Sequence, residues 1–166
     1  MNPQAMLAHL DAVRAETLKR FEPLSQEQLD WKPVAGAAEG APEYDTAHEQ
    51  WSLGEIFMHL ALDEHYLREQ IARPLLEGVK PPDSILFLPP PPPYALPKDA
   101  IAFWFQRARE ITRRLLENEN GKWNLELRHA GGFDEGMNGA EWLMGYAGHE
   151  QFHHKQIDEM IARVQK

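Results

Sequence analysis

Histidines are the residues of this chain with the clearest capacity for chemistry, because the sequence contains eight of them and no cysteine. The absence of cysteine excludes disulfides, thiolate nucleophiles and every zinc site built on cysteine. His149 and His153 stand four residues apart in a segment with helical periodicity. Residues i and i+4 lie one turn apart on the same side of a helix, so two imidazoles with this spacing can bind one metal ion.

Helical counting places these two histidines on the apolar side of their helix. At 100° per residue, the stripe that contains His149 and His153 also contains Trp142, Tyr146 and Met160. A polar side chain on a buried face needs a partner. The two imidazoles are therefore predicted to face the core and to have a ligand or a hydrogen-bond partner there.

His59 is also a polar residue on an apolar face, in a second helix. It shares a face with Ile56 and Tyr66, and Asp63 lies about 40° away. Two ligands from one helix and a third from a facing helix can build a metal site in a bundle core, and three histidines leave zinc an open fourth position. Spacing alone leaves an alternative open, in which the buried imidazoles are only hydrogen-bonded, to Asp63, Tyr66 or Gln156.

The remaining histidines lack this placement. We predict surface or loop positions for four of them: His9, His48, His65 and His129. His154 falls on the face that carries Glu150 and Asp158, and these three residues are predicted to form a solvated series.

The segment from His149 to His153 also matches the H-E-x-x-H pattern of zinc proteases, in which the glutamate is a general base. Those enzymes need a third ligand further along the chain, where this sequence has Gln156 and Glu159 in place of the required glycine and histidine. A zinc-protease fold is therefore not expected. Glu150 has two open interpretations, a base beside the metal or a surface charge, and the second is the more ordinary.

Four amphipathic helices must position these side chains. Apolar residues at intervals of three and four predict helices over residues 3–21, 52–73, 98–119 and 138 to near the C-terminus. Ser52 and Glu55 form a capping box at the start of the second helix, and Pro74 is expected to stop or kink that helix. No strand alternation is evident. The predicted fold class is all-α, a four-helix bundle in a single domain over residues 1–166.

The connection between the second and third helices is about 20 residues long. This length is sufficient for a crossover along the bundle. It contains the run Pro89 to Pro93, which favours extended polyproline II and is predicted to be a stiff spacer.

Charge and hydropathy exclude several classes of partner. The 26 acidic residues outnumber the 17 basic residues and give a net charge of −9, which opposes binding to nucleic acids and to anionic membranes. No apolar run approaches the roughly 18 residues of a membrane span, and no secretory signal is visible at the N-terminus. The expected location is the cytoplasm.

Three segments together resemble the DinB-like family, which includes the YfiT-type proteins regarded as metal-dependent hydrolases. They are the turn from Leu29 to Pro33, the helix start Trp51-Ser52 with His59 two turns later, and the ending that runs from His149 through His153 to Gln156-Ile157. The resemblance covers nearly the whole chain. Carried over by motif, it assigns the metal ligands to His59, His149 and His153, the same residues that helical counting places inward.

The resemblance also implies a bundle with a crossover linker, often a homodimer, that holds a divalent ion such as zinc or nickel. It does not imply DNA binding. Some members of the family are thiol transferases or isomerases that use bacillithiol, mycothiol or glutathione. This chain departs from the commonest ending, with His154-Lys155 in place of Arg-Gly, and it also contains the proline run.

The expected function is a metal-dependent enzyme that acts on a small molecule, as a thiol S-transferase or a hydrolase. The metal ion would lower the pKa of a bound thiol or water, and Asp63 could orient the ring of His59. No catalytic residue is assigned from the sequence. The alternatives are a non-catalytic metal-binding or stress-responsive module and a plain helical scaffold with hydrogen-bonded histidines.

Overall fold

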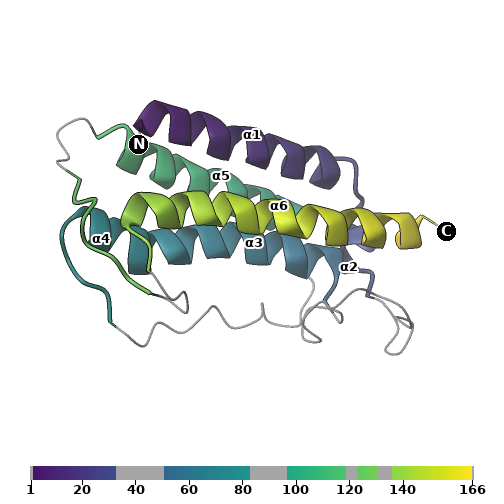
Figure 1. The fold of residues 1–166 in the computed structure, drawn as a ribbon. Helices are drawn as coiled ribbons and strands as arrows, with labels where there is room; N and C mark the ends of the chain where they lie inside the picture. The colour runs from purple at the N-terminus through teal and green to yellow at the C-terminus, as the bar shows by residue number, and fades with distance from the viewer. Residues whose placement is uncertain (1, 33–50, 83–96, 119–122, 131–135, 166) are drawn as a thin grey trace.

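A computed structural model describes residues 2–32, 51–82, 97–118, 123–130 and 136–165. These parts form four long helical rods packed side by side (Figure 1). Three rods are the single helices α1 (Pro3–Phe21), α5 (Lys98–Leu116) and α6 (Gly139–Val164), and the fourth joins α3 (Leu53–Leu67), the π-helical η2 (Arg68–Ala72) and α4 (Arg73–Leu76). A short helix α2 (Gln26–Asp30) precedes this composite rod. The described residues contain no strand, and the predicted all-α bundle is confirmed.

Side-chain caps fix where the helices begin. The Ser52 hydroxyl accepts from the Glu55 backbone N–H at 3.1 Å, and the Glu55 carboxylate accepts from the Ser52 backbone N–H at 2.6 Å. Asn138 and Glu141 form the same reciprocal pair at the start of α6. Both predicted capping boxes are therefore present, and they satisfy N–H groups that the first helical turn cannot pair.

The composite rod does not end at Arg73, as the position of Pro74 had suggested, but continues to Leu76. The backbone N–H of Arg73 donates to the carbonyl oxygen of Arg68, five residues earlier. This π-helical turn is wider than an α-helical turn and lies directly before the proline. The wider turn relieves the clash between the proline ring and the preceding turn, so the helix passes through Pro74 without ending.

Each rod packs mainly against two of the others. α1 contacts α5 and α6, and α3 also contacts α5 and α6, so α1 and α3 lie diagonally across the bundle. α1 and α6 run in one direction, and α3 and α5 run in the other (Figure 1).

The connection between the second and third rods has its two described ends at opposite ends of the bundle (Figure 1). α4 lies at the same end of the bundle as the start of α1 (Figure 1), whereas Lys98 at the start of α5 donates to the carbonyl oxygens of Glu22 and Leu24 at the far end of α1. The predicted crossover is confirmed. The run Pro89 to Pro93 lies outside the described residues, as does His48.

The core consists of two apolar clusters with charged residues between them. The first cluster includes Leu10, Leu75 and Trp142, and the second includes Phe57 and Phe105. Between them, every rod contributes buried polar groups. We call these residues the central ion cluster: Arg14, Thr17, Glu64, Arg109, Thr112, Tyr146 and Glu150. Of the helices in the described ranges, none combines the length and hydropathy that a membrane span requires.

Candidate metal centre

Three histidines from two helices converge between α3 and α6. His59 comes from α3, and His149 and His153 come from α6. Each offers a ring nitrogen, and the three nitrogens lie within 4.8 Å of one another. The Nε2 atoms of His149 and His153 are 3.1 Å apart. Two nitrogens that are each about 2.0–2.1 Å from a tetrahedral zinc ion lie roughly 3.3 Å apart, so this spacing fits one shared ion.

The centre is buried on one side and open on the other. His59 and His153 are buried, whereas the His149 side chain is 33% exposed. The ring of Trp51 packs edge-on against His59, with 5.0 Å between centroids, and the largely exposed Phe152 lies beside His153. The side of His149 is therefore the more exposed side of the group.

Gln156 fixes the orientation of one ring. The Nδ1 atom of His153 donates to the side-chain oxygen of Gln156 at 2.8 Å. An amide oxygen only accepts hydrogen bonds, so Nδ1 carries the proton and Nε2 keeps its lone pair. That lone pair is on the nitrogen that faces His149. A metal-binding histidine commonly has this arrangement, with one nitrogen on the ion and the other on an acceptor.

Asp63 stands between the other two rings. Its Oδ2 atom lies 3.4 Å from Nε2 of His59 and 3.3 Å from Nδ1 of His149. The sequence placed Asp63 beside His59 on the same helix, and the structure adds the contact to His149 across the helix interface. Burial raises the pKa of Asp63 to about 7. One carboxylate oxygen thus lies within ion-pair distance of two imidazole nitrogens, one from each helix.

Comparison with known proteins agrees with this arrangement. The sequence matches the DinB superfamily over residues 9–157. The chain belongs to the DinB superfamily. Searches of curated proteins and of solved structures returned no match. The matched range contains Asp63, Gln156 and all three histidines, and the bundle of this DinB-superfamily protein therefore carries a histidine group able to hold a metal ion.

Glu150 is not a solvated charge in this DinB-superfamily bundle, and that prediction was wrong. It is 0% exposed, and its carboxylate accepts from Nε of Arg14 at 2.8 Å and from the Thr17 hydroxyl at 2.5 Å. α6 is covered by α1 on this side as well as by α3 on the histidine side, so two of its faces are buried. Glu150 is turned toward α1, and its position does not support a role as base at the metal.

Arg14 and Thr17 stabilise the negative charge of the Glu150 carboxylate. Burial works to raise the pKa of Glu150, but the charge of Arg14 and hydrogen bonds from Arg14 and Thr17 outweigh it, and the pKa lies below its ordinary value. Tyr146 is fully buried nearby, and burial raises the pKa of its hydroxyl. The central ion cluster therefore contains a charged Glu150 carboxylate and a neutral Tyr146 phenol.

Three other histidines also differ from their predicted surroundings. His154 is half-buried, with Nε2 2.8 Å from the Thr17 hydroxyl, and burial lowers its pKa. His65 is half-buried and hydrogen-bonded to Arg68, so it does not simply face solvent. His129 lies in a loop as predicted, but it is buried, and it pairs with Met137 in an isolated β-bridge. His9 is exposed, in agreement with the prediction.

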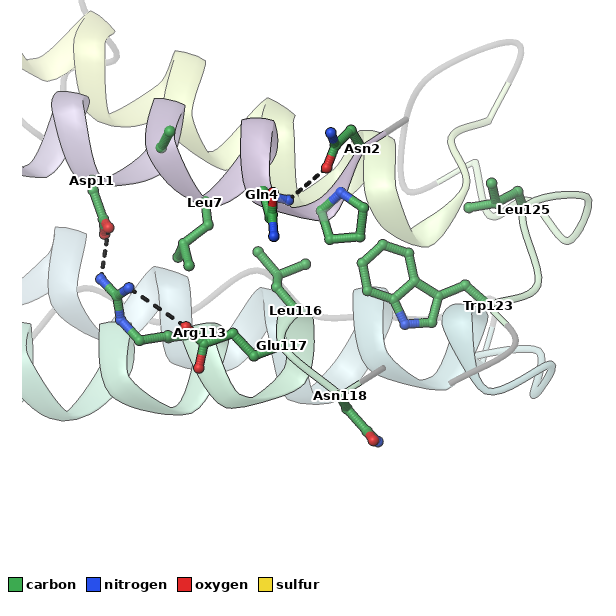
Figure 2. Close-up of a pocket in the computed structure, with 12 residues that line it drawn as sticks. Asn2, Gln4, Leu7, Asp11, Arg113, Leu116, Glu117, Asn118, Trp123 and Leu125 are labelled. Atoms are coloured by element: carbon green, nitrogen blue, oxygen red, sulfur yellow. Dashed lines mark hydrogen bonds and ion pairs between the residues drawn. The ribbon is translucent and has the colours of Figure 1, made fainter. Parts of the chain in front are cut away.

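A cavity of about 840 Å³ lies on the opposite side of the bundle from the histidines, between α1 and α5 (Figure 2). Leu7, Leu116 and Trp123 provide apolar walls. Asp11 accepts from Arg113 at 2.6 Å along one side. The cavity shares no residue with the histidine group and is separate from the candidate metal centre.

Proposed function

We propose that this protein binds one divalent metal ion, zinc or nickel, through His59, His149 and His153. The observation that carries the proposal is the convergence of three ring nitrogens, from two helices, within 4.8 Å. Neutral imidazole is a suitable ligand for both metals. Three protein ligands leave at least one position for another molecule, which is the arrangement of catalytic rather than structural zinc sites.

Two acceptor groups orient these ligands. Asp63 faces one nitrogen of His59 and one of His149, and Gln156 holds Nδ1 of His153. Such partners fix which ring nitrogen carries the proton and strengthen the remaining nitrogen as a ligand. When bound, the ion would supply the Lewis acidity that makes a thiol or a water molecule nucleophilic at neutral pH.

We further propose that the protein is an enzyme acting on a small molecule, by thiol S-transfer or by hydrolysis. The exposed edge of His149 supports this idea, because a substrate needs access to the ion. The sequence contains no cysteine, so any reacting thiol must come from a small cosubstrate. The family resemblance also leads us to propose a homodimer. A nucleic-acid partner is not proposed, because the net charge of −9 opposes binding to phosphates.

Elemental analysis of untagged protein tests the metal site. We expect about one divalent ion per chain, and we expect His149→Ala to lose it. His9→Ala is the matched control, since His9 is exposed on α1, and it should retain the ion. A wild-type protein that stays empty after dialysis against zinc, nickel and manganese would disprove the site.

Turnover assays on the metal-loaded protein separate an enzyme from a binding module. Thiol–electrophile pairs and hydrolysable esters or amides are the first substrates to screen. Turnover that disappears in His149→Ala supports the enzyme. A large fall in Tm on chelation, with no turnover of any pair, favours the non-catalytic metal-binding module instead.

A further inference from the structure

The two helices that carry the histidines are joined by a hydrogen bond at the level of the metal centre. The Tyr146 hydroxyl on α6 donates to the carbonyl oxygen of Leu60 on α3 at 2.7 Å. Leu60 directly follows His59, and Tyr146 lies one helical turn before His149. This hydrogen bond therefore helps to fix the register of α6 along α3 at the level where the imidazoles meet.

Arg14 holds the same two helices from the opposite side, through α1. Its Nη2 atom donates to the Tyr146 hydroxyl at 2.7 Å and to Glu64 at 2.9 Å, and its Nε atom donates to Glu150 at 2.8 Å. Glu64 directly follows Asp63 on α3, and Glu150 directly follows His149 on α6. The guanidinium thus contacts the chain neighbour of one metal-centre residue on each helix.

Consecutive residues on a helix move together when the helix rotates. Rotating α6 so that His149 leaves the metal centre also moves Glu150 away from Arg14. Rotating α3 so that Asp63 leaves the centre likewise moves Glu64 away from Arg14. Arg14 and both carboxylates are at most 4% exposed, so water cannot replace the lost bonds. A buried charge without its partner is strongly destabilising, and such rotations are therefore suppressed.

We propose that Arg14, together with Tyr146, is a positioning residue of the metal centre. It acts through Glu64 and Glu150 to hold α3 and α6 in the rotation and register at which the three imidazoles converge. The inference rests on the proposed metal site. It extends that site to α1, a helix that contributes no metal ligand.

Metal affinity measured against a competing chelator tests the proposal. Direct hydrogen-bond partners of the ligands are typically worth about 10–100-fold in metal affinity, and because Arg14 acts one step further from the ion we expect Arg14→Met to lose zinc affinity at the lower end, about 10-fold. Tyr146→Phe removes a single hydroxyl and should cause a smaller loss. The absorption spectrum of the Co²⁺-loaded protein should also change in both variants, because it reports the geometry of the ligands.

Leu10→Ala is the matched control. Leu10 lies one turn before Arg14 on α1 and is buried in the first apolar cluster, so its truncation destabilises the bundle without removing any hydrogen bond or charge of the central ion cluster. This control should keep the wild-type zinc affinity and the wild-type Co²⁺ spectrum. An affinity loss in Leu10→Ala equal to that in Arg14→Met would overturn the positioning role, because general destabilisation would then explain both.

Two other outcomes separate this inference from the proposed function. If the wild type binds one ion and both variants match its affinity and spectrum, the positioning role is wrong and the metal site stands. If the wild type binds no ion, both proposals fail together. Should Arg14→Met not fold, Tyr146→Phe decides alone, since losing a phenol oxygen leaves the ring packing intact.

Discussion

The Oδ2 atom of Asp63 on α3 lies 3.3 Å from Nδ1 of His149 on α6, and the same atom lies 3.4 Å from Nε2 of His59. One carboxylate is thereby shared between two candidate ligands from different helices. Its buried position excludes most of the water that would otherwise hydrate it. The arrangement makes Asp63 the residue whose replacement should disturb two ligands at once.

Replacing Asp63 with asparagine should weaken metal binding by roughly 10–100-fold. The amide is a poorer acceptor than a carboxylate, and it can no longer help to neutralise the ion. Competition titration with a chelator measures the change. Asp158→Asn provides the comparison, because Asp158 is an exposed carboxylate on α6, the helix that carries His149, and it is paired with Arg20. Equal affinities in the two variants would contradict the shared role of Asp63.

Zinc added to the metal-free protein should raise its Tm. A ligand that binds only the folded state at 100 times its Kd adds about 2.7 kcal/mol to the free energy of unfolding. His153→Ala should show no such rise, because it removes one ligand of the three. His9→Ala should respond like the wild type. A rise of the same size in His153→Ala would show that zinc binds elsewhere.

Gly139→Ala should destabilise the protein by about 1–3 kcal/mol. A Cβ atom at residue 139 would overlap the carbonyl oxygen of Ala72 and lie 2.6 Å from Cγ of Leu76, so the start of α6 would be pushed away from α4. Gly148→Ala, on the same helix, meets nothing within 4 Å and should be neutral or stabilise by up to about 1 kcal/mol. Urea unfolding of the two variants compares them directly.

Unfolding free energy of the metal-free protein should fall as the pH decreases from 7, in part because of His65. Burial, followed by the charge of Arg68, lowers the pKa of His65 below the ordinary 6.5. The unfolded chain therefore takes up the proton first, and the loss begins near pH 6.5 and is complete below the folded pKa. His65→Gln should show a shallower slope of stability against pH in this window. An unchanged slope would mean that other groups account for the whole effect.

The histidine group was accessible to sequence reasoning because its signal is local. His149 and His153 interrupt an apolar stripe at helical spacing, and His59 does the same on α3. Counting at 100° per residue is sufficient to place such residues on the inward side. It does not establish that the two helices face each other, which came from the family resemblance and is confirmed by their packing.

Glu150 and Arg14 were not accessible in the same way. Glu150 lies outside the apolar stripe of its helix, where a charged residue is normally solvated, and Arg14, Glu64 and Glu150 are separated by 50 or more residues of chain. Only the assembled bundle brings them together, because α6 is covered on two sides. The burial of His129 was not predicted for a similar reason, because the residues that pack against it, Trp142 and Met137, are distant from it in the sequence.

The π-helical turn η2 changes which residues of the composite rod can face α6. The one extra residue in the wide turn shifts the residues that follow it by about 100° around the rod, relative to an uninterrupted α-helix. Both halves of the rod do contact α6, the histidine half at the metal centre and the apolar half at Gly139. The turn is a phase correction, which lets one continuous helix supply a candidate ligand at one level and a tightly packed wall at another.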